Sequence, residues 1–314
     1  MAEKQSFSIK GNRKNKALVE HVAEAVFTVC ALLAVVAVAS ITVYMIINGT
    51  PALFKVGIKE ILFGTVWQPA AKDPSFGILY VILTSIVGTT AAVLIGAPVG
   101  ILTAVFIEEI ASPRLAAIVK PAVELLAGIP SVIYGLLGIY LLNPMMYKLE
   151  IALFADAPDH QFTGGANLIS AVIVLAVMIL PTVINVTVSA LHAVPKQQKA
   201  ASLAMGATRI QTIFKVLLPS ARSGIAAAVV LGTGRAIGEA MAVVMVCGNM
   251  ANFPKLLGTV RPLTTGIVLE MGYSSGLHRQ ALFSIGLVLF VFIMIVNISF
   301  TIVSRRGVKI DGKE

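Results

Sequence analysis

Two opposite charges lie four residues apart in an apolar stretch of this chain. Arg235 and Glu239 fall within residues 224–248, where glycine and alanine are their main neighbours. Four residues correspond to about 40° around an α-helix, so the two side chains can share one face. A guanidinium stays charged, and its planar N–H groups match the oxygens of an oxyanion in pairs. The pattern therefore predicts either a structural ion pair or a site that an anion passes.

A charge in such a stretch restricts what its helix can face. If residues 224–248 cross a bilayer, Arg235 lies near the middle, where an arginine costs about 2.5–3.5 kcal/mol or more. Such a residue has to face protein or water, and Glu239 would hold it in place when no anion is bound. On the structural alternative, Gly234 and Gly238 simply let this helix pack closely against a neighbour.

The composition indicates which elements must position these charges. Of the 314 residues, 57% are hydrophobic and 12% are charged, and the mean hydropathy is +0.92. A soluble domain carries roughly 25% charged residues, so an ordinary soluble globule, a disordered chain and a coiled coil are excluded. A transmembrane helix needs about 20 apolar residues. Six such runs predict an all-α membrane protein with six transmembrane helices, at residues 22–47, 77–107, 122–142, 168–191, 224–248 and 281–303.

The basic residues predict the orientation of these helices. Sixteen lysines and arginines fall in segments that would be cytoplasmic if both termini are inside, against seven in the outer segments. By the positive-inside rule, residues 1–21 and 304–314 are cytoplasmic, and residues 22–303 form the lipid-embedded domain of a multi-pass protein of the cell membrane. The net charge of +9 reflects this orientation, so no nucleic-acid partner is expected. The two cysteines and four histidines show no ligand spacing, which predicts no metal site.

Residues 193–222 form a basic segment between the fourth and fifth apolar runs. The segment holds five lysines and arginines and no acidic residue, and its small apolar residues recur at helical spacing. Gly206 is expected to separate two short amphipathic helices, and Pro219 to end the second. A helix with such a bare apolar face either docks in a groove of a partner protein or lies on the membrane surface.

This segment resembles the coupling loop of ABC importer permeases. Ala200-Ala201-Ser202, Gly206-Ala207 and Leu218-Pro219 match the family pattern E-A-A-x-x-x-G followed by L-P, except that Ala200 stands where the family has Glu. The resemblance implies that the short helix sits in a cleft of an ATP-binding subunit. ATP and Mg²⁺ would then be bound by that partner, and this chain would hold no cofactor and catalyse no reaction of its own.

Four further segments are similar to the phosphate-transport permeases. They are Trp67-Gln68-Pro69, Phe76 to Leu79, Pro130 to Gly135 and Gly234 to Ala240, and the first two look like the C-type subunit in particular. The resemblance covers residues 17–306. It implies a type I permease that pairs with an A-type subunit, above two ATP-binding subunits and below an extracytoplasmic phosphate-binding protein.

The charges within residues 224–248 and the proline at position 130 also indicate which residues line the translocation path. Arg235 would meet phosphate, and Glu239 would accept a hydrogen bond from a protonated phosphate. Ser131 and Tyr134 lie next to Pro130, where a bend would expose backbone to the path.

Glu124 has two interpretations. It is either a further path residue or an acid in the first turn of a helix that Pro121 begins, a position that is favourable for local reasons. The polar residues of the second apolar run are expected to be packing contacts, namely Thr84, Ser85, Thr89 and Thr90.

Two other functions are compatible with the same residues. The first is a permease of the same architecture that carries another oxyanion, such as sulfate or molybdate. The second is an ion-coupled secondary transporter that uses Arg235 and Glu239 as a relay. The spacing of the coupling-loop motif favours an ATP-driven importer over the second alternative.

Overall fold

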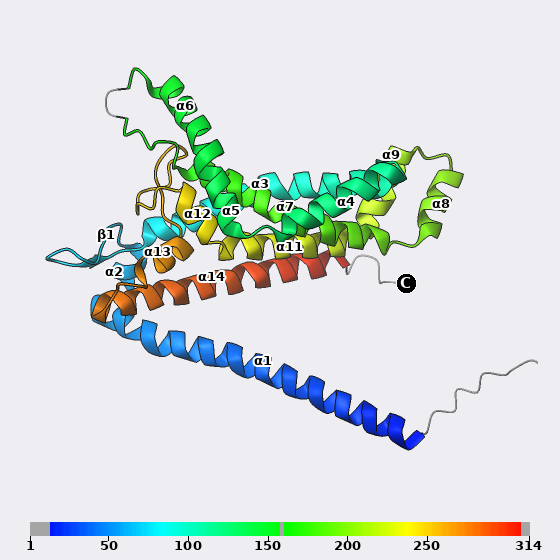
Figure 1. The fold of residues 1–314 in the computed structure, drawn as a ribbon, viewed down its shortest axis with the longest axis horizontal. Helices are drawn as coiled ribbons and strands as arrows, with labels where there is room; N and C mark the ends of the chain where they lie inside the picture. Colours follow the sequence, from blue (N-terminus) through cyan, green and yellow to red (C-terminus); the bar gives the residue numbers. More distant parts are fainter. Residues whose placement is uncertain (1–12, 158–159, 309–314) are drawn as a thin grey trace, which may run out of the picture. The chain divides into compact units, whose positions relative to one another are not determined.

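The computed structural model describes residues 13–157 and 160–308. These residues are mostly helical, with one short two-stranded sheet (Figure 1), which confirms the predicted all-α membrane class. They divide into two compact units, one up to Asn48 and one from Gly49 onward. Residues 1–12 and 309–314, which belong to the predicted cytoplasmic segments, lie outside the described residues.

Helix α1 (Arg13–Val56) provides the whole described part of the first unit. No charged residue occurs between Glu24 and Lys55. Large apolar side chains, such as Val26 and Phe27, are exposed at successive positions and therefore on all sides of the helix. A helix that is apolar all round needs apolar surroundings. Its residues Glu20–Val56 are long and apolar enough to cross a membrane, as the first predicted span requires.

Helix α7 (Leu168–His192) lies between α3 (Leu79–Val105) and α11 (Arg222–Gly238) in the second unit (Figure 1). The helices α3 and α7 match the predicted spans at 77–107 and 168–191. Most of α7 is buried, so its side chains form much of the interior of this unit.

Glycines allow the neighbours of α7 to approach it closely. A Cβ atom at Gly96 of α3 would come within 2.7 Å of Ile179. One at Gly232 of α11 would come within 2.8 Å of Val183. Lipid is as apolar as a side chain, so helices in a membrane associate through such close packing of small residues.

The third predicted span, at 122–142, joins parts of two helices and is wrong in its boundaries. Helix α4 (Pro113–Gly128) ends two residues before Pro130, and the helical run that follows, Ser131–Phe154, is long and apolar enough to cross a membrane. Proline lacks an amide hydrogen and disfavours helical backbone at the residue before it, so the chain breaks here. The second run consists of α5 (Ser131–Leu137), the π-helical turn η2 (Gly138–Leu142) and α6 (Asn143–Phe154).

The fifth predicted span, at 224–248, is also interrupted. Helix α11 ends at Gly238, and α12 (Met241–Val246) begins after the extended backbone of Glu239. The helical run before α11, Arg209–Ser220, meets it at 71°. Five helices of the described chain are long and apolar enough to cross a membrane, and the bent pair raises the number to the predicted six. The last of them is α14 (Gly276–Val308).

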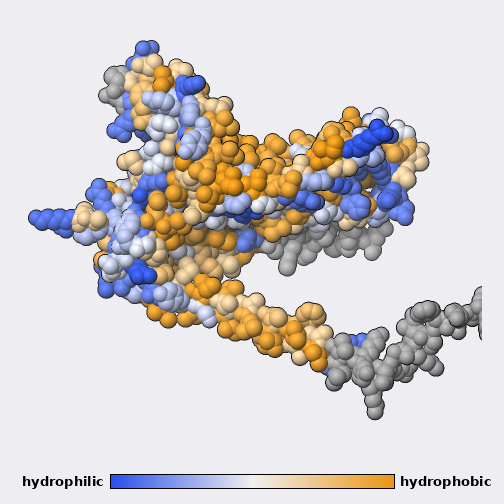
Figure 2. Space-filling view, in the orientation of Figure 1, coloured by the Kyte–Doolittle hydropathy of each residue, from blue (hydrophilic) through white to orange (hydrophobic). Residues whose placement is uncertain are grey.

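The two ends of the second unit differ from its middle. Helix α8 (Lys196–Ala204) lies at one end, and the short strands β1 (Trp67–Gln68) and β2 (Ser75–Phe76) lie at the other (Figure 1). On the face shown in Figure 2, hydrophilic residues gather at both ends and hydrophobic residues cover the region between them. This is the distribution expected of a unit that crosses a membrane.

The end with the strands has its own apolar core. Helices α2 (Ile58–Phe63) and α13 (Leu263–Glu270) pack there beside the sheet, in which Trp67 pairs with Phe76. The core cluster includes the fully buried side chains of Ala52, Ile61, Ile78, Leu263 and Leu282.

Candidate functional site

The chain leaves the helix between Arg235 and Glu239, and this separates the two charges. Glu239 has extended backbone, with φ −73° and ψ 129°. Its carboxylate accepts a hydrogen bond from the backbone N–H of Ala242 at 3.0 Å, and its carbonyl accepts one from the Thr264 hydroxyl at 2.8 Å. The predicted shared face of Arg235 and Glu239 is therefore wrong, because the glycine-rich helix, which is weak by propensity, stops at Gly238.

Arg235 is exposed on a face of α11 that the described chain does not cover. A Cβ atom at either Gly234 or Gly238 would meet no other atom within 4 Å. Within residues 13–157 and 160–308 the guanidinium makes no hydrogen bond or ion pair, although its charge acts on Tyr134. A charged side chain on an apolar helix has to meet water or protein. This face is therefore not a lipid-facing surface.

Tyr134 and Ser131 belong to α5, which packs against α12 next to the break at Glu239. Tyr134 is buried, and its hydroxyl donates to the carbonyl of Leu126 at 2.7 Å. That bond spans the interruption at Pro130, so Tyr134 ties α4 to α5. Ser131 is the half-buried first residue of α5. The structure thus brings Tyr134 close enough to Arg235 for an electrostatic interaction. Ser131 lies one helical turn before Tyr134.

Glu124 is not in the first turn of a helix, so the local explanation of this residue is wrong. Pro121 lies inside α4 and does not begin it. The helix begins instead at Pro113, after Ser112, whose hydroxyl accepts a hydrogen bond from the backbone N–H of Leu115 at 3.4 Å. Glu124 is an exposed carboxylate for which the described chain provides no partner.

A small cavity lies beside Glu239, lined by residues of α3, α7, α11 and α13. Its volume of about 20 Å³ has room for about one water molecule, so it is too small to be a path for an oxyanion. Thr84 and Ser85 line it from α3, and the Ser85 hydroxyl accepts a hydrogen bond from the backbone N–H of Leu263 at 2.8 Å. The predicted packing role is confirmed for the buried Thr84, Ser85 and Thr89, whereas Thr90 is exposed.

Residues 193–222 fold into two short helical runs, as predicted. Helix α8 is followed by Gly206 with φ +85°, a left-handed conformation that favours glycine. A capping box of Thr208 and Gln211 starts the second run. That run continues through Pro219 and ends at Ser220. It consists of α9 (Arg209–Thr212), the π-helical turn η3 (Ile213–Leu217) and α10 (Leu218–Ser220).

The residues of the coupling motif divide between two faces of α8. Ser202 points toward the second run, with its hydroxyl 2.9 Å from that of Thr212. Ala200 and Ala201 are exposed, and Met205, just beyond the helix, is 88% exposed. The helix therefore presents an uncovered apolar face. The remaining motif residues are the half-buried Ala207 and Leu218 and the exposed Gly206 and Pro219.

Glu108 and Glu109 belong to none of the recognised sequence motifs, yet they organise the α8 end of the molecule. Both lie in the π-helical turn that ends α3. Glu109 pairs with Lys199 of α8 at 2.5 Å, and Glu108 lies 3.0 Å from Lys120 and 2.9 Å from His192. The only sequence feature that could have indicated this role is an acidic pair at the end of an apolar run. Its partners come from three other segments, and no local pattern could identify them.

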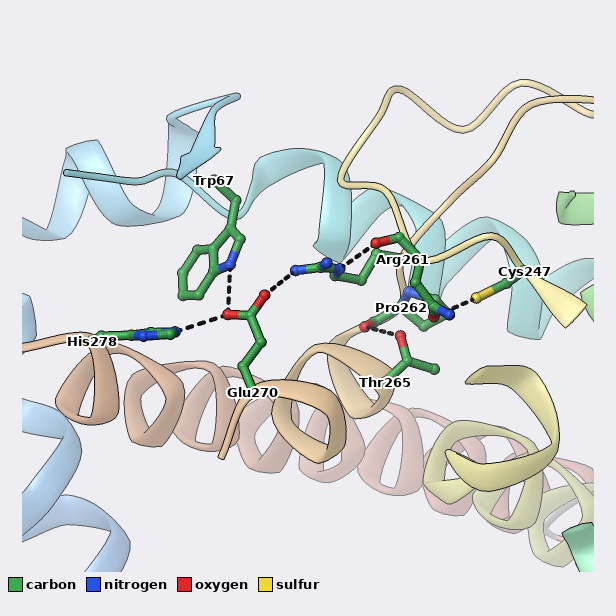
Figure 3. Close-up of polar contacts among 8 residues, drawn as sticks. Trp67, Cys247, Arg261, Pro262, Thr265, Glu270 and His278 are labelled. Carbon is green, nitrogen blue, oxygen red and sulfur yellow. Dashed lines mark hydrogen bonds and ion pairs between the residues drawn. The ribbon is translucent and has the colours of Figure 1, made fainter. Parts of the chain in front are cut away.

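A buried carboxylate also organises the opposite end. Glu270, the last residue of α13, is 6% exposed and accepts a hydrogen bond from the Trp67 indole at 3.0 Å (Figure 3). Arg261 pairs with it at 2.5 Å, and His278 lies 2.8 Å from it. The three partners come from β1, from the loop before α13 and from α14. Trp67, which belongs to a segment similar to the phosphate permeases, therefore has a structural contact here.

Replacing Glu270 by methionine is expected to destabilise the protein. Arg261 and His278 would lose their carboxylate while staying mostly buried, and removing one partner of a buried pair costs about 3–5 kcal/mol. The measurement is the apparent melting temperature of the purified protein in detergent. Glu60→Gln, at an exposed carboxylate of α2, is the control and should melt like the unaltered protein. Equal melting temperatures for all three proteins would contradict this role of Glu270.

A second buried carboxylate, that of Glu150, binds residues of the segment after α6. Glu150 is fully buried and accepts hydrogen bonds from the backbone N–H and the hydroxyl of Thr163, each at 2.9 Å. His160 lies 2.9 Å from Glu150 and stacks on Phe154 with a centroid distance of 4.0 Å. The described part of this segment is therefore held by specific contacts.

These features define the class of the protein: it is a multi-pass α-helical membrane protein. Its fold is that of a type I ABC importer permease. It is similar to a chain in the crystal structure of a bacterial ABC transporter involved in the import of the acidic polysaccharide alginate, with a TM-score of 0.63 and 20% identity over 92% of this chain and 99% of that one. It is also similar to a chain of the inward-facing MetNI methionine ABC transporter, with a TM-score of 0.51 and 23% identity over 74% of this chain and 94% of that one.

The chain belongs to the family of binding-protein-dependent transport system inner membrane components, whose sequence model matches residues 96–308. It is 40% identical over 295 residues to the probable ABC transporter permease protein YqgH of Bacillus subtilis. This alignment covers 91% of this chain and 92% of the relative. It is 32% identical over 258 residues to the phosphate transport system permease protein PstC of Pasteurella multocida. This alignment covers 79% of this chain and 80% of the relative. The resemblance to phosphate-transport permeases is thereby confirmed.

Proposed function

We propose that this chain is the C-type permease subunit of an ATP-driven importer of inorganic phosphate and forms half of the translocation path. One observation carries the proposal: Arg235 is exposed on an uncovered helix face, in a chain whose relatives include proteins named phosphate transport system permeases. A guanidinium on that face is unstable against lipid, but it can bind the oxygens of phosphate in pairs. The face with Arg235 therefore borders the path.

The face of α11 that carries Arg235 can enclose a path only together with a second permease subunit. The surface around Arg235 is open, and the cavity beside Glu239 is too small for phosphate. We assign the opposite wall of the path to an A-type permease subunit. Ser131 and Glu124 would contribute to the wall formed by this chain, and Tyr134 would contribute chiefly by holding α4 and α5 together. Glu239 would accept a hydrogen bond from a protonated phosphate through the carboxylate oxygen that does not bind Ala242.

Helix α8 suits the role of a coupling helix. Its exposed Ala200 and Ala201, with Met205, would insert into a cleft of one of two ATP-binding subunits, which would bind and hydrolyse ATP with Mg²⁺. This chain would catalyse no covalent step. Closure of the ATP-binding subunits would move α8 and shift the path between outward-open and inward-open states.

We place the α8 end in the cytoplasm, because the loop at 193–222 carries only basic charges. The segments 1–21 and 304–314 would then also be cytoplasmic, and residues 22–303 would span the bacterial cell membrane. The end organised by Glu270 would face outward, toward an extracytoplasmic phosphate-binding protein.

Uptake of labelled phosphate tests this proposal. Cells that lack the gene are compared with the same cells after the gene is restored, with and without excess unlabelled sulfate. We expect uptake only with the gene, no effect of sulfate, and loss of uptake when ATP is depleted at constant membrane potential. Competition by sulfate or molybdate would identify another oxyanion as the substrate. Uptake that survives ATP depletion would indicate an ion-coupled transporter, and either result would overturn the proposal.

A further inference from the structure

Polar side chains, and not a buried apolar face, hold α8 in place. None of its residues is buried. Lys199 pairs with Glu109 at 2.5 Å, and this contact joins α8 to the end of α3, although the two residues are 90 positions apart. Two other contacts of α8 stay within residues 193–222, namely Gln198 with Ser220 at 2.8 Å and Ser202 with Thr212 at 2.9 Å.

Glu109 and its neighbour Glu108 connect α8 with two further helices. They lie in the π-helical turn η1 (Phe106–Ile110), and successive positions of this turn direct the two carboxylates to different partners. Glu108 lies 3.0 Å from Lys120 of α4 and 2.9 Å from His192, the last residue of α7. The Glu108 and Glu109 side chains are only 16% and 10% exposed. Each carboxylate is largely removed from water and therefore depends on its partner.

We propose that Glu108 and Glu109 form the junction through which a displacement of α8 reaches the transmembrane helices, with Glu109 and Lys199 as positioning residues for coupling. The inference rests on the proposed function, because it assumes that an ATP-binding subunit moves α8. The chain connects α8 directly to α7 and to the second helical run, but not to α3. The Lys199–Glu109 pair makes α3 follow α8, and Glu108 passes the same movement to α4.

The second helical run has apolar packing that does not involve the ion pair. Apolar contacts also hold the second helical run against the end of α3, so removing one charge leaves the packing intact. The cluster consists of the buried residues Val105, Leu191, Ile213, Leu217 and Ala221. A variant at Lys199 is therefore expected to fold and to assemble, and its defect appears in the transmission of movement.

The test compares Lys199→Met, Glu109→Gln and the double variant in the complete transporter. The two permease subunits and the ATP-binding subunits are reconstituted in vesicles, and the phosphate-binding protein is added outside. The measured quantity is the phosphate transported for each ATP hydrolysed. We expect each single variant to lower this ratio about fivefold, at the weak end of coupling energies because Lys199 is partly exposed. The double variant should be no worse than the single ones.

Two matched variants complete the design. Lys196→Met removes an exposed lysine of the same helix that has no partner in the described chain, and it should leave the ratio unchanged. Lys199→Arg keeps a cation opposite Glu109 and should retain most of the coupling.

Three results would overturn the inference. The first is an unchanged ratio in both single variants, and the second is a double variant in which the two losses multiply. The third is release of the ATP-binding subunit by Lys199→Met alone, which would assign Lys199 to docking. If the unaltered transporter hydrolyses no ATP in response to phosphate-loaded binding protein, the proposed function itself fails. That failure is seen before any variant is compared.

Discussion

Arg235→Lys is expected to abolish most phosphate uptake, although the variant keeps the positive charge. A lysine presents a point charge and cannot hold two phosphate oxygens in the plane of a guanidinium. Charge-assisted hydrogen bonds are worth about 1.5–3 kcal/mol, which corresponds to roughly a 10- to 100-fold lower initial rate. The measurement is the initial rate of labelled phosphate uptake in cells with equal amounts of the permease in the membrane.

Arg279→Lys is the matched control for this prediction. Arg279 is exposed in the first turns of α14, and the described chain gives its side chain no partner. The same substitution there should leave uptake unchanged. Near-normal uptake in Arg235→Lys at normal abundance would contradict a role for Arg235 in binding phosphate. It would favour the structural alternative, in which this segment serves only to pack helices.

Ala201→Glu is expected to release the ATP-binding subunit from the permease. Ala201 belongs to the uncovered apolar face of α8, so a carboxylate there would be buried without a partner when the helix docks. A buried unpaired charge costs several kcal/mol, which is enough to reduce association by two orders of magnitude or more. The measurement is co-purification of the ATP-binding subunit with a tagged permease, together with phosphate uptake.

The adjacent residue provides the control for this substitution. Ala200→Glu introduces the same side chain one position earlier, where the coupling motif of related importers has Glu. We expect this variant to retain the ATP-binding subunit. Equal retention by both variants would show that α8 does not dock through this face, and equal loss would show that neither position tolerates a carboxylate.

Local sequence was sufficient to predict most of the membrane-crossing helices and the two helical runs of the loop at 193–222. A bilayer removes water from backbone and side chains alike, so a run of about 20 apolar residues has few alternatives to a helix. Gly206 is equally local, because a positive φ there favours glycine whatever the surroundings. These features depend on neighbours along the chain and can be read from spacing.

The effect of each proline was not predictable in this way. Pro98, Pro121 and Pro181 lie inside helices, whereas Pro130 stands at the break between α4 and α5. Neighbouring helices and side chains can satisfy the backbone groups that a proline frees, so its tolerance depends on what packs beside it. The prediction that Pro121 begins a helix was wrong for this reason, and the third span was misplaced with it.

The sequence by itself determined the membrane class, the family resemblance and the presence of a charged arginine in an apolar helix. Only the tertiary structure decided which groups each charge contacts. Glu109 reaches Lys199, and Glu270 accepts a hydrogen bond from the Trp67 indole, each from a distant part of the chain. A carboxylate bonds to the donors that helix packing brings within about 3 Å. Helical periodicity relates only residues a few positions apart, so it cannot specify those partners.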